Sequence, residues 1–244
     1  MNKKLAVFSF VLALVLGLSA VADLSLEEII GKLQANQSKI KDMYVETLTT
    51  INSNMSAPGQ ENKGPQKMVQ KSKMWTKGQD KAKIEMLSPN KQVTITNGDK
   101  MVIINPETGQ KMVQDLAKMR AQGMSSGNQG MNLDKVKEFF DLNVKQIGGQ
   151  YVITGVPKKA NQALGKMEFY IDQEKWQTVK IMMYDAKGRL INQSDIGYQE
   201  IDDVWVPAKN KSVMLTPMGK MDVEMEMSNV KINQGIKDSE FRVE

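Results

Sequence analysis

Apolar and polar residues alternate with a period of two along most of the chain. The clearest example is MDVEMEMSNVKI, residues 221–232, where methionine and valine alternate with Asp222, Glu224 and Glu226. This period predicts an extended strand with one apolar face and one solvated face. Methionine is flexible and polarizable, and it is common where a surface must fit variable apolar partners. The pattern therefore raises the question whether this strand faces a fixed core or an exchangeable ligand.

The same period predicts a series of short strands along the chain. The segments between them are rich in turn-forming residues, because Pro fixes φ while Asn-Gly and Thr-Gly tolerate positive φ. Short strands at this regular spacing predict an antiparallel meander that curls strongly or closes. The predicted strands span residues 45–55, 67–78, 81–87, 91–100, 101–111, 142–147, 150–157, 165–174, 177–185, 190–201, 204–217 and 220–232.

Two segments have helical spacing instead. Residues 24–46 form an amphipathic pattern that begins with a capping-box pair, Ser25 and Glu28. Residues 112–140 predict two short helices around a glycine- and methionine-containing loop. Such an insertion in a meander is expected to lie across a face of the sheet as a lid. The predicted lid residues are Leu116, Met119, Met124 and Met131.

Sorting each strand by parity gathers apolar side chains on one face. The opposite face collects charged and polar side chains, including Gln92 and Thr94. We therefore expect a mainly β fold with some α: a strongly curved antiparallel meander sheet, with an N-terminal helix and a central helix–loop–helix lid on its concave face. The residues predicted to line the concave face are Ile84, Met86, Val93, Ile95, Met101, Ile103, Met167, Phe169, Ile171, Val179, Ile181, Met183, Met221, Val223, Met225 and Met227.

Few helices are available to cover so wide a sheet. An apolar concavity with a lid is typical of a pocket for an apolar ligand. Helices can also fill a half-barrel with core side chains, and the sequence leaves both interpretations open.

Composition limits the chemistry. The chain has no Cys and no His, which excludes disulfides, thiolate nucleophiles, histidine acid/base catalysis and the common zinc sites. The row formed by Asp222, Glu224 and Glu226 is typical of a solvated strand face. We expect a binding protein rather than an enzyme, with no cofactor and no bound metal.

The N-terminus predicts export. MNKK precedes an apolar run of signal-peptide size, and Ala20 and Ala22 form an A-x-A cleavage site. We expect residues 1–22 to be a signal peptide cleaved after Ala22, and residues 23–244 to form one periplasmic domain. Removal of the two N-terminal lysines lowers the formal charge from +5 to +3. Without a dense Lys/Arg run, nucleic acid is not an expected partner. A monomer is expected.

Two stretches resemble the LolA/LolB-like lipoprotein-carrier superfamily. Residues 74–116 contain Trp75-Thr76-Lys77, a hairpin over Pro89–Lys100, and Ile104-Asn105-Pro106-Glu107. Residues 167–211 contain Asp203-Val204-Trp205-Val206-Pro207, which corresponds to the family's strand introduced by G-x-x-[VI]-P, with Asp203 in place of the Gly. The order and spacing of these motifs cover nearly the whole chain.

The resemblance implies an unclosed β-barrel whose helices cover an apolar cavity for lipoprotein acyl chains or another lipid. It also implies an inner-membrane exporter and an outer-membrane acceptor as partners. Carriers of the best-known type have an Arg after the Lys of the W-x-K strand, and Gly78 stands there in this chain. A different lid contact is therefore expected.

Two other functions stay open. Other members of the superfamily, such as RseB-like regulators, sense envelope stress, so a lipid-sensing regulatory or interaction protein is one alternative. Thioether ligands select Cu(I), which makes a copper protein the other. Its candidate ligands are the close sets Met225 with Met227, Met182 with Met183, and Met218 with Met221.

Overall fold

The computed structural model of the chain describes residues 24–55, 64–121, 133–159 and 163–243. The predicted signal peptide lies outside these ranges, as do Met124 and Met131 of the predicted lid. No helix in the described part is both long and apolar enough to cross a bilayer.

Helix α1 (Leu26–Ser38) begins at the predicted cap. The Glu28 N–H donates to the Ser25 hydroxyl oxygen, and the Ser25 N–H donates to the Glu28 carboxylate, so the capping box is complete. The helix is shorter than predicted, because strand β1 already begins at Asp42. Val45 in that strand is almost fully buried.

The remaining chain forms one thirteen-stranded antiparallel sheet in the order β6-β5-β4-β3-β2-β1-β13-β12-β11-β10-β9-β8-β7. Every ladder except β1–β13 joins strands that follow each other along the chain, which is the predicted meander. The strands are β1 (Asp42–Ser53), β2 (Gln66–Lys77), β3 (Lys81–Ser88), β4 (Gln92–Asn97), β5 (Lys100–Ile104), β6 (Lys111–Asp115), β7 (Phe140–Ile147), β8 (Gln150–Pro157), β9 (Lys166–Asp172), β10 (Gln177–Tyr184), β11 (Leu190–Ile201), β12 (Val204–Thr216) and β13 (Gly219–Ile232).

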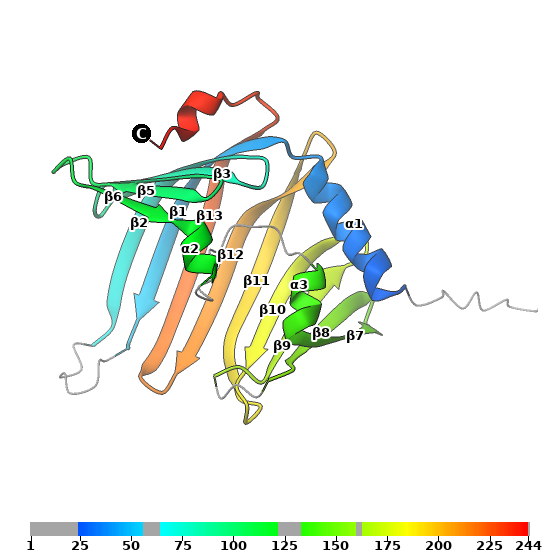
Figure 1. Ribbon diagram of the computed structural model, residues 1–244. Helices are drawn as coiled ribbons and strands as arrows, with labels where there is room; N and C mark the ends of the chain where they lie inside the picture. The colour runs from blue at the N-terminus through cyan, green and yellow to red at the C-terminus, as the bar shows by residue number, and fades with distance from the viewer. Residues whose placement is uncertain (1–23, 56–63, 122–132, 160–162, 244) are drawn as a thin grey trace, which may run out of the picture.

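The barrel is unclosed, as predicted. Its two edges are β6 and β7, which do not pair with each other. Helix α2 (Leu116–Ala121) follows β6 directly, and helix α3 (Leu133–Phe139) leads directly into β7. The sheet is strongly curved, and α1, α2 and α3 lie on its inner side (Figure 1).

Strand β6 is a difference from the sequence prediction. Residues 112–115 were expected to begin the first lid helix, but they pair with β5, with Ile103 opposite Met112. A five-residue stretch is too short for its periodicity to separate a strand from a helix. The helix starts only at Leu116, whose side chain is buried.

The cross-strand register defines an inner and an outer face, because directly paired residues of antiparallel strands lie on the same side of a sheet. We call inner the face on which Ile171, Tyr151 and Ile153 pack against Ile29 of α1. A second core cluster joins Val204, Val206 and Ile232 near the junction of α1 and β1.

Strand β4 faces the other way from the prediction. Val93 pairs with Glu85 and Ile95 with Lys83, so both valine and isoleucine lie on the outer face. Gln92 and Thr94, expected on the solvated face, lie on the inner one. The parity rule failed here because this stretch of the outer face is covered.

The cover is the 3-10 helix η1 (Asp238–Phe241), which lies against β3 and β4. The Glu240 carboxylate accepts a hydrogen bond from Lys83 Nζ at 3.0 Å, and Asn97 donates to the Phe241 carbonyl. Phe241 is fully buried, and Ile95 is buried on the same outer side. A small core on the outer face thus explains the apolar residues of β4.

Candidate functional site

One end of the inner face is filled by helix α1. Ile29 of the helix and Ile171 of β9 have no exposed surface, and Tyr151 and Ile153 of β8 are buried around them. Trp176 stacks on Tyr151 with ring centroids 5.9 Å apart. We call this cluster the packed end. It is a fixed core with no room for a ligand.

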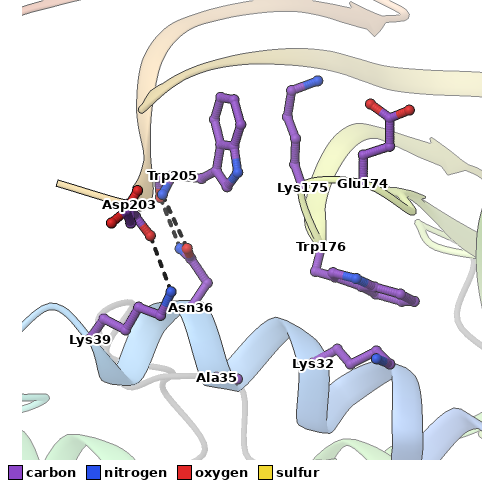
Figure 2. Close-up of a pocket in the computed structure, with 9 residues that line it drawn as sticks. All are labelled: Lys32, Ala35, Asn36, Lys39, Glu174, Lys175, Trp176, Asp203 and Trp205. Carbon is purple, nitrogen blue, oxygen red and sulfur yellow. Dashed lines mark hydrogen bonds between the residues drawn. The ribbon is translucent and has the colours of Figure 1, made fainter. Parts of the chain in front are cut away.

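A buried asparagine holds α1 in place. The Asn36 amide donates to the Trp205 carbonyl at 2.9 Å, and its oxygen accepts the Trp205 N–H at 3.1 Å. The side chain thus pairs with β12 as a neighbouring strand would, as Figure 2 shows. Lys39 adds a hydrogen bond to the Asp203 carbonyl. These contacts fix the helix across the end of the sheet.

A hollow of about 340 Å³ lies beside this anchor, between α1 and two β-turns (Figure 2). Lys32 Nζ lies 4.6 Å from the centroid of the Trp176 ring, and Lys175 Nζ lies 5.4 Å from that of Trp205. The hollow combines both signs of charge with two indole rings. Its lining residues are Lys32, Ala35, Asn36, Lys39, Glu174, Lys175, Trp176, Asp203 and Trp205.

Period-two sorting could not find this hollow, because most of its residues stand on turns and on α1. Two of the lining residues, Trp176 and Asp203, have a positive φ, of 52° and 57°. Bulky residues rarely adopt this conformation. Asp203 and Trp205 fall in the five-residue motif of the family resemblance, and Glu174, Lys175 and Trp176 fall in the longer stretch that contains it.

Helix α3 is tied to α1 by an ion pair. The Lys137 ammonium donates to the Glu27 carboxylate, and this hydrogen bond holds the pKa of Glu27 below its usual range. Lys158 Nζ also donates to the Lys137 carbonyl. One of the two predicted lid helices is therefore fastened at the packed end.

The centre of the inner face is covered much less. We call Met221, Val223, Met225 and Met227 of β13 the methionine row. All four are only half-buried by the described residues. Met214 of the neighbouring strand β12 and Met68 of β2, which lies beyond β1, keep about 38% and 40% of their residue surface exposed. The methionine row with these two neighbours is called the open centre.

The inner face of the central strands has no charge. Cross-strand pairing extends this uncharged face from the methionine row to Thr49 and Thr47 of β1, and from these to Gln70 and Ser72 of β2. In the stretches paired beside the methionine row, no Asp, Glu, Lys or Arg of the described residues shares its face. These stretches are residues 181–183 of β10, 192–196 of β11, 210–214 of β12, 47–53 of β1 and 68–72 of β2. A neutral, partly apolar surface of this kind suits hydrocarbon.

The face is not uniformly apolar, however. Thr47 and Ser72 share a hydrogen bond with their oxygens 2.6 Å apart. Strands β11 and β12 also place Asn and Ser side chains on the inner face, and Asn210 and Ser212 of β12 pair directly with Met225 and Val223 of the methionine row. Sorting apolar residues by parity does not reveal these polar positions.

A second hollow, of about 620 Å³, lies at the β6 edge of the inner face. Ile103 and Met112, which pair directly across β5 and β6, contribute its apolar part. Neither hollow described here is lined by the methionine row. The lining residues are Asn90, Lys91, Gln92, Ile103, Asn105, Glu107, Gln110, Lys111 and Met112.

The register brings most of the predicted lining residues onto the inner face. Val93 and Ile95 lie on the outer face instead, and Val179 stands at a β-bulge between β9 and β10. Ile171 belongs to the packed end rather than to an open surface. The residues on the inner face are Ile84, Met86, Met101, Ile103, Met167, Phe169, Ile171, Ile181, Met183, Met221, Val223, Met225 and Met227.

The predicted lid residues are only partly described. Leu116 is buried at the start of α2, and its N–H donates to the Asp99 carbonyl. Met119 belongs to α2, but its side chain lies outside the described residues, as do Met124 and Met131 entirely.

The outer face of the central strands is charged. Glu224 accepts hydrogen bonds from Lys209 and Lys211, whose Nζ atoms lie 2.6 Å and 3.1 Å from its carboxylate. These hydrogen bonds, that of Lys209 first, hold the pKa of Glu224 below its usual range. Asp222 and Glu226 share this face, so the row of carboxylates is solvent-facing and paired with lysines.

The methionine pairs proposed as copper ligands are mostly separated. Met182 pairs with Glu168 on the outer face, and Met183 pairs with Met167 on the inner face. Met218 is exposed in the turn between β12 and β13. Met225 and Met227 alone remain a close set on one face.

Solved structures with this architecture come from several bacteria. A DUF1329 family protein from Desulfovibrio piger is 18% identical, with a TM-score of 0.60, covering 89% of this chain and 97% of that one. A LolA superfamily protein from Nitrosomonas europaea is 14% identical, with a TM-score of 0.56 and coverages of 90% and 98%. An outer membrane lipoprotein-sorting protein domain from Vibrio parahaemolyticus is 16% identical, with a TM-score of 0.57 and coverages of 88% and 95%.

This chain has the LolA-like fold. The recognition made from the motifs is thereby confirmed at the level of the fold. A family model described as "Uncharacterized protein" matches residues 132–244. No curated protein matches the sequence.

The fold also shows the position of Gly78, which stands where the best-known carriers have an arginine. It stands in the turn after β2 with a positive φ of 59°, and its N–H donates to the Lys41 carbonyl. An arginine at this position would be strained, because residues with a Cβ rarely adopt this conformation. The arginine of the best-known carriers therefore has no equivalent at this position.

Proposed function

We propose that this protein is a periplasmic carrier that binds acyl chains on the open centre of its inner face and shuttles them toward the outer membrane. The observation that carries the proposal is the methionine row: a flexible apolar surface that stands on the central strand of the sheet and is only half-buried. A core strand of an ordinary half-barrel would bury these side chains.

The physical basis of binding is the removal of hydrocarbon from water. Each buried CH₂ group contributes about 0.8 kcal/mol, so a long acyl chain needs no polar anchor for useful affinity. Methionine side chains adapt to chains of different length and branching. The uncharged inner face avoids the cost of desolvating an ion beneath the cargo.

The cargo in this proposal is the acyl chains of lipoproteins or another acylated lipid. An inner-membrane exporter would load it and an outer-membrane acceptor would receive it. The proposed export route begins with cleavage after Ala22. The LolA-like fold supports the proposal because one solved structure with this fold is named as a lipoprotein-sorting protein domain.

A double substitution tests the binding face. Met225→Lys with Ile181→Lys places two ammonium groups on the inner face, on β13 and β10. Titration with a fluorescent polyene fatty acid should show an affinity loss of at least about 100-fold, since burying an unpaired charge costs several kcal/mol. The matched control is Thr50→Lys with Gln193→Lys, which adds the same charge to the outer face. It should bind as the unmodified protein does.

Equal binding by the folded inner-face variant would place the site on another surface. Native mass spectrometry of the mature protein, purified from the periplasm, gives a second readout. Acyl cargo should be found at masses that match lipid or lipoprotein. Consistently empty protein that also fails to bind the fatty acid would rule out the carrier function.

A further inference from the structure

The inner face carries a row of four polar side chains between two apolar tracts. Ser194 Oγ lies 3.3 Å from Asn192 Oδ1 on β11, and Ser212 Oγ lies 3.3 Å from Asn210 Oδ1 on β12. The two serine oxygens are 2.6 Å apart and join the strands. We call these four residues the polar ladder.

Its position in the sheet follows from the register. Ser194 pairs with Ile181 of β10 on one side and with Ser212 on the other, and Ser212 pairs with Val223 of the methionine row. Neighbouring strands lie about 4.8 Å apart, so the ladder is a polar band about 5 Å wide. Apolar residues of β9–β10 flank it on one side and those of β13 flank it on the other.

Each asparagine stands among apolar neighbours. Asn192 is paired with Met183 and Met214, and Asn210 is paired with Ile196 and Met225. Asparagine is depleted in strand interiors, where it packs poorly on the pleated surface. Asn192 and Asn210 nevertheless stand at half-buried positions among apolar residues. Their presence there indicates a role other than folding.

The ladder does not satisfy its own hydrogen-bonding groups. With both asparagine oxygens turned toward the serines, as here, two hydroxyl hydrogens serve three oxygen–oxygen contacts, so only two of the contacts are hydrogen bonds at one time. No residue in the described part of the chain accepts a hydrogen bond from the amide NH₂ of Asn192 or of Asn210. A polar group among apolar side chains gains most from a ligand that supplies its missing hydrogen-bond partner.

We propose that the polar ladder binds the ester carbonyls of a diacylglyceryl group, while its two acyl chains lie on the flanking apolar tracts. This inference rests on the proposed carrier function and specifies its cargo. A diacylglyceryl ester has a polar junction with two hydrocarbon arms, which matches a polar band between two apolar surfaces. The carbonyl oxygens accept hydrogen bonds from the asparagine amides.

The experiment compares an ester lipid with its ether analogue, which has the same chains and no carbonyls. Competition against a bound polyene fatty acid should show that the unmodified protein prefers the ester by about tenfold, as expected for one to two added hydrogen bonds. Asn192→Leu with Asn210→Leu should lose this preference and keep its affinity for the ether. Gln193→Leu, on the outer face of β11, should keep the preference and serves as the control.

Each outcome separates the two proposals. Equal binding of ester and ether by the unmodified protein overturns the ladder inference and leaves the carrier function standing. A preference that survives in the double asparagine variant also overturns it. Failure of the unmodified protein to bind either lipid overturns the carrier function itself.

Two further arms complete the design. If the asparagine variant does not fold, Ser194→Ala with Ser212→Ala tests the same ladder with smaller changes, and the ester preference should fall by about threefold. The diacylglyceryl group can come from a phospholipid or from a lipoprotein. The ester–ether comparison is therefore made twice, once with a phospholipid and once with a diacylglyceryl lipopeptide. The protein should prefer the ester in at least one of the two comparisons. Equal binding of ester and ether in both overturns the inference.

Discussion

The packed end and the open centre belong to the same face of one sheet and arise from the same alternating pattern, yet they differ in burial. At the packed end, Ile29 of α1 covers Ile171 completely. At the open centre, the methionine row has only half-buried side chains, and Met68 and Met214 are exposed. The difference lies in the helix cover, since α1 is fixed over β8 and β9 by Asn36 and its contacts to β12.

This contrast shows what an apolar strand face can and cannot tell. Apolar parity marks the side of the sheet that avoids water, but it does not say whether protein or ligand covers that side. Residue type gives a further indication. The packed end uses branched and aromatic side chains such as Ile153 and Tyr151, which have well-defined rotamers. The open centre uses methionine, which adapts its shape.

The largest predicted effect separates the two regions by stability. Ile29→Ala should lower the free energy of unfolding by about 3 kcal/mol, because it leaves a cavity in a fully packed cluster. Met225→Ala should lower it by less than about 1 kcal/mol, because the side chain is only partly buried. Chemical denaturation of both variants measures the difference. Equal losses would show that the open centre is an ordinary core.

An intermediate effect is expected from the anchor of α1. Asn36→Ala removes two hydrogen bonds and leaves the Trp205 backbone groups unpaired, which should cost about 2 kcal/mol. Gln37→Ala, at an exposed position of the same helix, is the matched control and should be nearly neutral. Thermal unfolding measures both variants. Hydrogen exchange should also speed up in α1, and an unchanged rate there would contradict the anchoring role.

The smallest predicted effect concerns the outer side of the open centre. The lowered pKa of Glu224 means that its charged form favours the folded state. This contribution is fully present above the unfolded value of 4.5 and is lost as the pH falls through the lower folded value. Glu224→Gln should therefore be slightly less stable than the unmodified protein at neutral pH and equally stable in acid.

Salt provides the check on that prediction. The ion pairs of Glu224 with Lys209 and Lys211 are solvent-exposed, so high salt should screen them and reduce the neutral-pH difference. Denaturation curves at several pH values and two salt concentrations measure this. A difference that persists in acid and in high salt would show that Glu224 acts through packing rather than charge.

The sequence predicted the architecture because its signals are local. Alternation, turn residues and the Ser25–Glu28 capping box each depend on neighbours a few positions apart, and the meander repeats them. The central helices also followed from the order of the elements, whereas the unclosed barrel was implied by the family resemblance. The predicted lining residues on β9, β10 and β13 share one face for the same reason.

The failures have distant causes. Val93 and Ile95 face outward because η1, more than 140 residues later in the chain, covers that side of β4. The anchoring by Asn36 depends on a partner 169 residues away. The polar ladder depends on the register of β11 and β12, in which Ser194 meets Ser212. Periodicity within a strand contains no information about any of these contacts.

The central position of β13 has a consequence for folding. Ser53 of β1 pairs with Met221, and Met43 pairs with Ile232, so this ladder joins segments from opposite ends of the described chain. All other ladders among the described strands can form between consecutive hairpins. Two meanders can therefore assemble locally, and the β1–β13 seam, which requires the most distant contacts, is expected to form slowly and last. Because the methionine row stands on that seam, the step that completes folding is also the step that makes the inner face continuous.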